Sequence, residues 1–204
     1  MITIHHLNAS RSHRILWLME ELGLAYELAL YQRDAKTRLA PPELRAVNPL
    51  GKAPAIVDDG RVVIESGAII DYVIRRHGGG RLQPDPATPA YDEYVQWLHF
   101  AEGSAMLPLM LHLYTSRLGE AAAPLSPRIG SEIANHLGHV DRSLAGKSYL
   151  MGETFTGADI MMLDVASIAR RSGKLEPYAN LSAWLDRVQE RPAYKAAVAR
   201  GGAR

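Results

Sequence analysis

The sequence predicts a small α/β domain followed by an all-helical domain, and three observations support this. Residues 2–31 follow the order strand, helix, strand, which implies two parallel strands joined by a crossover helix. Residues 53–64 hold two short apolar segments around an Asp-Asp-Gly turn, as in an antiparallel hairpin. After about residue 88 the apolar residues recur only at helical spacing. Strands first and helices after are typical of two such domains.

The first three elements follow from apolar spacing. Residues 2–7 alternate as a strand does, and residues 26–31 read as a second strand. Between them Gly23 ends a run of helical spacing. The apolar residues of this helix are Ile15, Leu16, Leu18, Met19 and Leu22.

Prolines and turn residues divide the next segment. Residues 32–51 are irregular, apart from a short helix expected at 42–47. We expect a third strand over 53–57, interrupted by Pro54, and a fourth over 62–64. A helix with one apolar side should follow over 66–76.

A Gly- and Pro-rich stretch marks the expected domain boundary. We place the first domain at residues 1–79, the linker at 80–87 and the helical domain at 88–204. Helices are expected at about 89–118, 127–145, 157–171 and 181–190, with a short one from Pro192.

Composition excludes several classes of function. The chain has 23 Lys and Arg against 22 Asp and Glu, so nucleic acid and anionic membranes are not expected partners. No long apolar run and no signal-peptide pattern is present, so we expect a cytoplasmic protein. There is no cysteine, which excludes disulfides and any protein thiol. The eight histidines form no convincing metal pattern, so no metal is expected.

Ser10 is the first candidate for chemistry, because it lies between a strand and a helix. Exposed N–H groups and the helix dipole favour an anion there. A hydroxyl at this place could donate a hydrogen bond to a thiolate supplied by a ligand. Ser12 is the local rival, and a plain helix-capping serine is the alternative reading.

Two further motifs could bind a peptide-like ligand. A cis bond between Ala53 and Pro54 would turn the Ala53 main chain outward, where an extended peptide could pair with it. Glu65 and Ser66 stand where a strand ends and a helix begins, and could bind an ammonium and a carboxylate group. The alternatives are an edge-strand proline and a simple helix cap.

The segment from Phe155 to Asp159 carries a structural motif. Thr156 can cap the next helix while Asp159 bonds back to the Thr156 N–H, a variant of the capping box. Phe155 could pack against Ile160 as a hydrophobic staple. Loss of Asp159 should cost about 1 kcal/mol of stability.

Together these motifs resemble the cytosolic glutathione transferase superfamily, serine-type, over essentially the whole chain. Their order and spacing, more than any single motif, carry the resemblance. One segment, Tyr31 to Leu44, looks like a branch shared by fungal and bacterial members. The motifs are Ser10-Arg11-Ser12-His13-Arg14 before Ile-Leu-Trp-Leu-Met-Glu-Glu-Leu, then Asn48-Pro49-Leu50-Gly51-Lys52-Ala53-Pro54, then Glu65-Ser66, then Phe155-Thr156-Gly157-Ala158-Asp159.

The resemblance implies a thioredoxin-like first domain that binds glutathione as co-substrate. Ser10 would activate the thiol. Lys52 would approach the glycyl carboxylate, and Ala53 would bond the cysteinyl part through its main chain, with Pro54 cis. Glu65 and Ser66 would hold the γ-glutamyl end.

The resemblance also implies an acceptor pocket and a homodimer. The pocket for a hydrophobic electrophile would lie between the domains, with candidates Met106, Met110, Tyr114 and Arg117. Glu102 is the candidate for an acidic residue that reaches the partner's γ-glutamyl amine. The sequence departs from some serine-type classes at Leu39, where they carry a histidine for the glycyl end; Arg38 or Lys36 could replace it.

We therefore predict a glutathione transferase that conjugates electrophilic small molecules, with a glutathione-dependent peroxidase activity as a further possibility. One alternative is a non-catalytic interaction module of the same fold, since fold does not fix function. Another is a specialised isomerase or dehalogenase that uses the same glutathione site.

Overall fold

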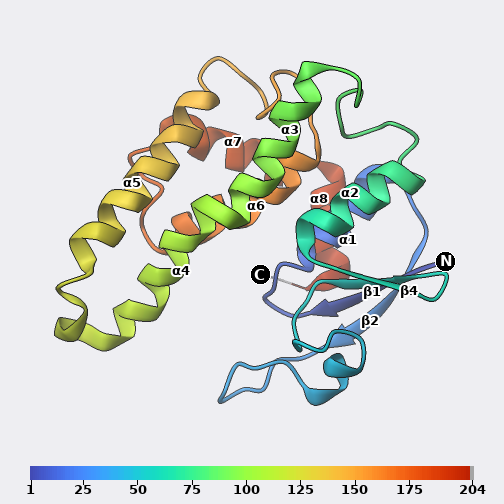
Figure 1. Ribbon diagram of the computed structural model, residues 1–204, viewed down its shortest axis with the longest axis horizontal. Coiled ribbons are helices and arrows are strands. Elements are labelled where there is room, and N and C mark those ends of the chain that lie inside the picture. Colours follow the sequence, from blue (N-terminus) through green and yellow to red (C-terminus); the bar gives the residue numbers. More distant parts are fainter. Residues whose placement is uncertain (203–204) are drawn as a thin grey trace. The chain divides into compact units, whose positions relative to one another are not determined.

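The computed structural model describes residues 1–202 and divides into two compact units (Figure 1). The first comprises Met1–Arg81 and the segment from Gln189 onward, and the second is Leu82–Val188. A mixed sheet with helices in the first unit and helices alone in the second confirm the predicted fold class. The sequence had assigned residues 88–204 to a single domain, whereas the contacts group the last helix with the sheet.

The first unit is built on a four-stranded sheet in the order β2-β1-β3-β4. β1 and β2 are parallel, while β1 with β3 and β3 with β4 are antiparallel, as in a thioredoxin-like domain. The strands are β1 (Ile2–Leu7), β2 (Tyr26–Tyr31), β3 (Ala55–Asp58) and β4 (Arg61–Ile64). The helices are α1 (His13–Leu22), the short 3-10 helix η1 (Pro42–Ala46), α2 (Ser66–His77) and α8 (Pro192–Gly201).

The start of the third strand differs from the prediction by two residues. We expected the third strand over 53–57, with Pro54 inside it, but β3 begins at Ala55. Proline has no N–H to donate, so the ladder starts after it. Residues 53 and 54 are therefore placed just before the strand rather than within it.

The last helix is anchored on α1, and Figure 1 shows the two side by side. Arg191, just before α8, bonds both carboxylate oxygens of Glu21 at 2.6 and 2.8 Å. The Trp17 indole donates to the same carboxylate at 2.8 Å. Glu21 is largely buried, and a bidentate arginine pair in that setting is stronger than an exposed one.

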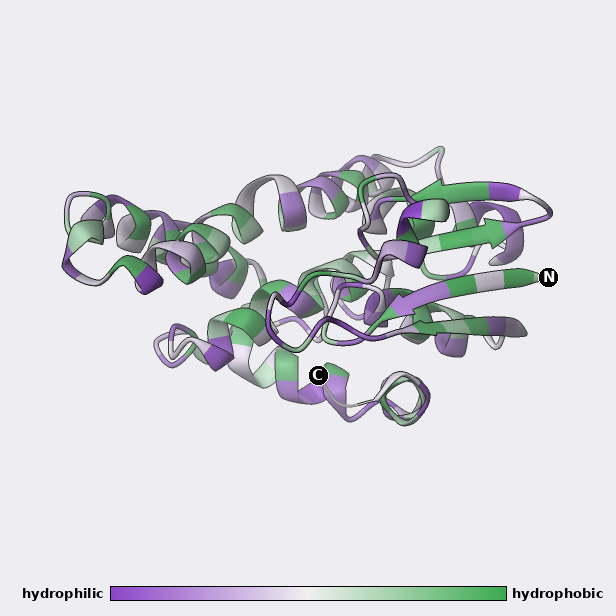
Figure 2. Cartoon of the chain, turned by 90° about the horizontal axis from the view of Figure 1, so that it is seen from below, coloured by the Kyte–Doolittle hydropathy of each residue, from purple (hydrophilic) through white to green (hydrophobic). Residues whose placement is uncertain are grey.

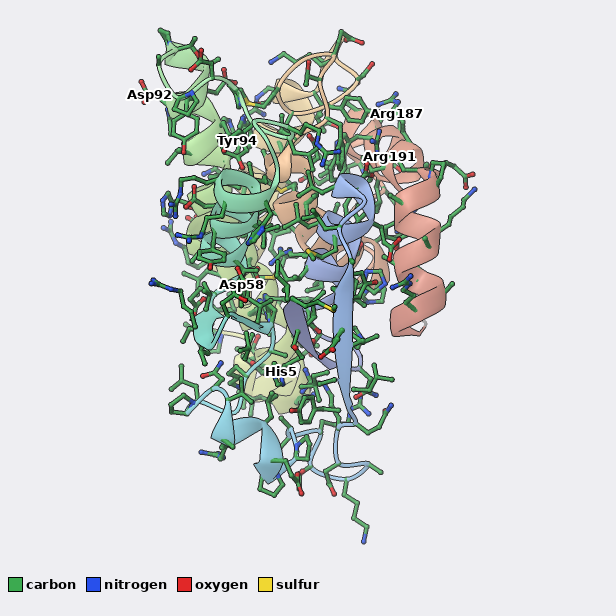
Figure 3. The ribbon with its side chains drawn as sticks, turned by 90° about the vertical axis from the view of Figure 1, so that its right-hand side faces the viewer. His5, Asp58, Asp92, Tyr94, Arg187 and Arg191 are labelled. Atoms are coloured by element: carbon green, nitrogen blue, oxygen red, sulfur yellow. The ribbon has the colours of Figure 1, made fainter. Side chains whose placement is uncertain are left out.

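The two ends of the sheet differ in chemistry. Figure 3 labels His5 and Asp58, which mark opposite ends of the β1–β3 pair. Asp58 is buried and accepts hydrogen bonds from Tyr72 at 2.9 Å and His77 at 2.7 Å. Burial raises the pKa of Asp58, but these bonds outweigh it and hold that pKa below its usual value. At this end of the sheet the Asp58 carboxylate is therefore bonded by side chains of the protein itself.

The second unit consists mainly of helices, and the sequence missed irregularities in them. The helix predicted over 89–118 is divided by the π-helical segment η2 (Ala101–Ala105). Pro108 lacks the N–H that the carbonyl of residue 104 would receive, which favours a local change of helical register. The other elements are α3 (Pro89–Phe100), α4 (Met106–Thr115), η3 (Ser116–Ala122), α5 (Ser126–Ser143), α6 (Gly157–Arg171) and α7 (Ala179–Gln189).

The predicted capping box at the start of α6 is confirmed. Thr156 accepts from the Ala158 N–H, and Asp159 accepts from the Thr156 N–H at 2.9 Å. Asp159 is fully buried and also accepts from the Leu150 N–H and the Trp184 indole, at 3.0 and 2.9 Å. It therefore joins three segments of the second unit. Within residues 1–202, none of the helices has the length and apolarity needed to cross a membrane.

Candidate functional site

Three predicted motifs of the first unit meet at one end of its sheet. The register pairs His5 with Ala55, and Ala55 with Ile64. The end of β1, the start of β3 and the end of β4 are therefore neighbours. Ser10 lies just after the end of β1, and Ala53-Pro54 lie just before the start of β3. Glu65-Ser66 lie just after the end of β4. In Figure 2 β1 turns from hydrophobic to hydrophilic as it approaches this end, where the sequence has His5 and His6.

The two candidate serines differ in exposure. Ser10 is half-buried in the turn between β1 and α1, whereas Ser12 is fully buried. The Ser12 hydroxyl lies 3.2 Å from the Leu7 N–H, 3.0 Å from the His6 Nδ1 and 2.7 Å from the Ser10 Oγ. Because Ser12 is engaged inside the protein, Ser10 is the serine that a ligand could reach. Neither serine caps α1 with its side chain.

The loop before β3 is held by Asn48, whose side-chain role the sequence did not indicate. Asn48 is buried, and its side-chain amide donates to the Lys52 carbonyl at 2.8 Å. Its side-chain oxygen accepts from the Leu50 N–H at 3.1 Å, and its main-chain carbonyl accepts from Gly51 at 2.7 Å. Gly51 has a φ of 60°, which favours glycine. The sequence motif from Asn48 to Pro54 contains this residue, but no role was assigned to its side chain.

The Ala53-Pro54 peptide bond is cis, as the resemblance implied. The Lys52 side chain is exposed and Pro54 is buried. The buried Asn48 side chain donates to the Lys52 carbonyl, so it holds the main chain just before the cis bond in place.

Glu65 adopts a backbone conformation that is rare for its type, with a φ of 71°. Such a conformation costs about 1–3 kcal/mol and is found mostly at functional positions. The alternative reading of Ser66 as a helix cap is wrong, because Glu65 is the cap residue and Ser66 the first residue of the helix. Because Ser66 is the first residue of α2, its main-chain N–H is one of the N–H groups that have no partner within the helix. N–H groups at the start of a helix can bind a carboxylate. Ser66 is buried and Glu65 is exposed.

An arginine beside the Ser10 turn was also missed. Arg33 donates from Nε to the Asn8 carbonyl at 3.1 Å and from Nη2 to the Ala9 carbonyl at 3.4 Å. A third bond, from Nη1 to the Arg38 carbonyl at 2.8 Å, ties the turn to the 33–39 loop. Burial, with the charges of Arg38 and Arg11, lowers the pKa of Arg33. The turn that carries Ser10 therefore has a positive electrostatic environment.

The remaining predicted residues are spread over both units. Lys36, Arg38 and Leu39 are exposed on the loop after β2. Glu102 lies in the π-helical segment of the second unit, half-buried. Met106 is buried in α4, Met110 is half-buried, and Tyr114 and Arg117 are exposed. Among residues 1–202 no group of three potential metal ligands is brought together.

Comparisons with known proteins match both parts of the chain. Residues 1–75 match the family model "Glutathione S-transferase, N-terminal domain", and residues 106–192 match "Glutathione S-transferase, C-terminal domain". The chain is 34% identical to Glutathione S-transferase 3 of Schizosaccharomyces pombe, over 97% of this chain and 87% of that protein.

Solved structures of glutathione transferases are also similar to this chain. A glutathione S-transferase from Actinobacillus pleuropneumoniae has a TM-score of 0.91 and 35% identity, covering 98% of this chain and 93% of that one. A glutathione transferase family member from Pseudomonas fluorescens, with two glutathione bound, has a TM-score of 0.83 and 26% identity. The match covers 97% of this chain and 92% of that one.

Proposed function

The chain belongs to the glutathione S-transferase family, and from that membership we propose that it binds glutathione and transfers the thiolate to an electrophilic small molecule. One observation carries the proposal. Ser10, the cis Ala53-Pro54 bond and the Glu65-Ser66 pair stand together at one end of the sheet. A fold used only as an interaction module has no need of this set, so we do not favour that alternative.

Each part of glutathione has a matching group in the first unit. The γ-glutamyl end carries a carboxylate and an ammonium, which suit the start of α2 at Ser66 and the carboxylate of Glu65. The main chain of Ala53 is proposed to pair with the cysteinyl part. Lys52 is proposed for the glycyl carboxylate, with Arg38 or Lys36 in the place of the family histidine.

Thiol activation is mainly an electrostatic task. A free thiol has a pKa of about 8.5, and lowering it by two units needs about 2.7 kcal/mol of preference for the anion. A hydrogen bond from the Ser10 hydroxyl, the start of α1 and the charge of Arg33 all favour the thiolate. Ser10 stays neutral when it donates to the thiolate, so it need not ionise. Holding the thiolate beside its acceptor then supplies the remaining rate enhancement.

A second substrate and a partner subunit are also part of the proposed enzyme. We propose that Met106, Met110, Tyr114 and Arg117 contact a hydrophobic electrophile. We also propose a cytoplasmic homodimer in which Glu102 reaches the partner's γ-glutamyl amine. Family membership supports these roles.

Replacing Ser10 tests the proposal most simply. Ser10→Ala should lower kcat about a hundredfold, because a donor to the reacting anion is lost. Glutathione affinity should stay within about threefold, since the other contacts remain. Ser131→Ala, an exposed serine on α5, is the matched control. Turnover of Ser10→Ala equal to that of the control would remove Ser10 from the mechanism.

A further inference from the structure

A chain of hydrogen bonds runs from Ser10 into the interior of the first unit. The Ser10 Oγ lies 2.7 Å from the Ser12 Oγ, which lies 3.0 Å from the His6 Nδ1. The His6 Nε2 lies 3.0 Å from the Gly201 carbonyl oxygen. Ser12 and His6 are both buried, with exposures of 0% and 2%. The chain therefore connects the candidate thiol site with a titratable group that solvent hardly reaches.

The partners of His6 fix the direction of these bonds. A carbonyl oxygen only accepts, so the His6 Nε2 carries a proton. In neutral His6 the Nδ1 must then accept, and the Ser12 hydroxyl donates to it. The lone pairs of the Ser12 Oγ accept from the Leu7 N–H at 3.2 Å and from the Ser10 hydroxyl. The Leu7 carbonyl, 3.3 Å from the Ser12 Oγ, is a longer alternative acceptor.

This arrangement directs the Ser10 proton away from a ligand while His6 is neutral. Ser10 donates inward to Ser12, and one of its lone pairs accepts from the Ser12 N–H at 3.2 Å. Its other lone pair remains, so it can accept a hydrogen bond from a thiol S–H. It cannot donate to a thiolate until its own proton has moved.

We propose that His6 is the positioning residue that receives the thiol proton of bound glutathione, through Ser12 and Ser10. The inference rests on the proposed role of Ser10. The thiol S–H bond breaks and its proton joins the Ser10 Oγ. The Ser10 proton passes to the Ser12 Oγ, and the Ser12 proton passes to the His6 Nδ1. Neutral thiol and neutral imidazole become thiolate and imidazolium, with no proton gained from or lost to solvent.

Every group in the chain is again satisfied after the transfer. His6 donates from both ring nitrogens, to Ser12 and to the Gly201 carbonyl. The Ser12 Oγ accepts from Leu7 and His6 and donates to Ser10. The Ser10 Oγ accepts from the Ser12 N–H and O–H, which leaves its own proton for the thiolate. The relay thus switches Ser10 from acceptor to donor as the thiol ionises.

The end of α8 suits a charged imidazole. Gly201 is the last residue of that helix, where the helix dipole is negative and favours a cation. A Cβ at Gly201 would lie 2.5 Å from Leu16 Cδ1 and 3.0 Å from His6 Cε1, so a side chain there would disturb this contact. Other groups facing His6 include the His13 ring on α1, 6.4 Å away between ring centroids, and its β2 register partner Leu30. Neither adds a second full positive charge while His13 is neutral.

Counting protons tests the relay in the wild-type protein. Glutathione binding is measured by calorimetry in two buffers of different ionisation enthalpy, while ultraviolet absorbance reports the bound thiolate. Near pH 7 the wild type should release well under one proton for each thiolate formed, because His6 retains the proton. Release of one proton per thiolate would overturn the inference. This count needs no variant.

The variant His6→Asn keeps a polar group near Ser12 but cannot take up a proton. It should form about tenfold less thiolate at neutral pH, and release about one proton for each thiolate that does form. His5→Asn is the matched control, since His5 bonds Tyr31 and lies outside the relay. A His6→Asn profile equal to that of His5→Asn would contradict the relay. Absence of any thiolate in the wild type would instead contradict the proposed function itself.

Discussion

Burial separates two serines that the sequence left as rivals. Ser12 is enclosed and bonded to main-chain and side-chain groups, while Ser10 remains partly open. Spacing alone does not distinguish them, because both precede α1 within one turn. The same is true of His6, whose role depends on a contact with Gly201, 195 positions later in the chain. Such a contact leaves no local signal in the sequence.

Glu65 offers a prediction about a single side chain. Glu65→Ala should weaken glutathione binding about 10- to 100-fold, because a charge-assisted bond to the γ-glutamyl amine is worth about 1.5–3 kcal/mol. The substitution keeps an L-residue at the same unusual φ, so the backbone is not relieved. Calorimetric titration measures the affinity.

Glu65→Gln is the companion variant, since it keeps the shape of the side chain and removes only the charge. Its affinity should fall between those of the wild type and Glu65→Ala. An unchanged dissociation constant in both variants would exclude Glu65 from the glutathione site.

At the scale of elements, the sequence predicted most helices and strands but not their interruptions. The spacing of apolar residues was sufficient for the strand–helix–strand opening and for α6, whose predicted range is the observed one. The π-helical segment was missed because apolar spacing hardly changes across a local register shift. The grouping of α8 with the sheet was missed because it depends on Arg191 and Glu21, which are far apart in sequence.

Asp159 gives a prediction for a helix start. Its carboxylate serves the Thr156 and Leu150 N–H groups and the Trp184 indole, so Asp159→Ala would leave buried donors without an acceptor. We expect a loss of about 2–4 kcal/mol, more than the about 1 kcal/mol of an exposed cap. Chemical denaturation measures it.

Asp159→Asn is the companion variant, since it removes the charge of the side chain but keeps its shape. The asparagine keeps one oxygen as an acceptor but places its amide N–H₂ group against another donor. We therefore expect a loss of stability between zero and that of Asp159→Ala. A loss of less than about 1 kcal/mol in Asp159→Ala would show that Asp159 does not join the segments as the distances indicate.

At the scale of the whole molecule, the nearly balanced charge and the absence of cysteine agree with an enzyme whose thiol arrives with its substrate. The first unit carries the residues that sequence motifs could identify, because the proposed glutathione contacts lie in short segments of the chain. The residues proposed to contact the acceptor lie on α4 and the segment after it, where several side chains are exposed and no motif constrains them. Sequence reasoning therefore predicts the co-substrate better than the electrophile.

The claim that this chain binds glutathione and activates its thiol is tested most directly by calorimetric titration of the full chain with glutathione. An ultraviolet difference spectrum across pH reports the ionisation of the bound thiol. We expect saturable binding and a bound thiol whose pKa lies well below its free value of about 8.5. No binding at millimolar glutathione, or a bound thiol that ionises like the free one, would contradict it.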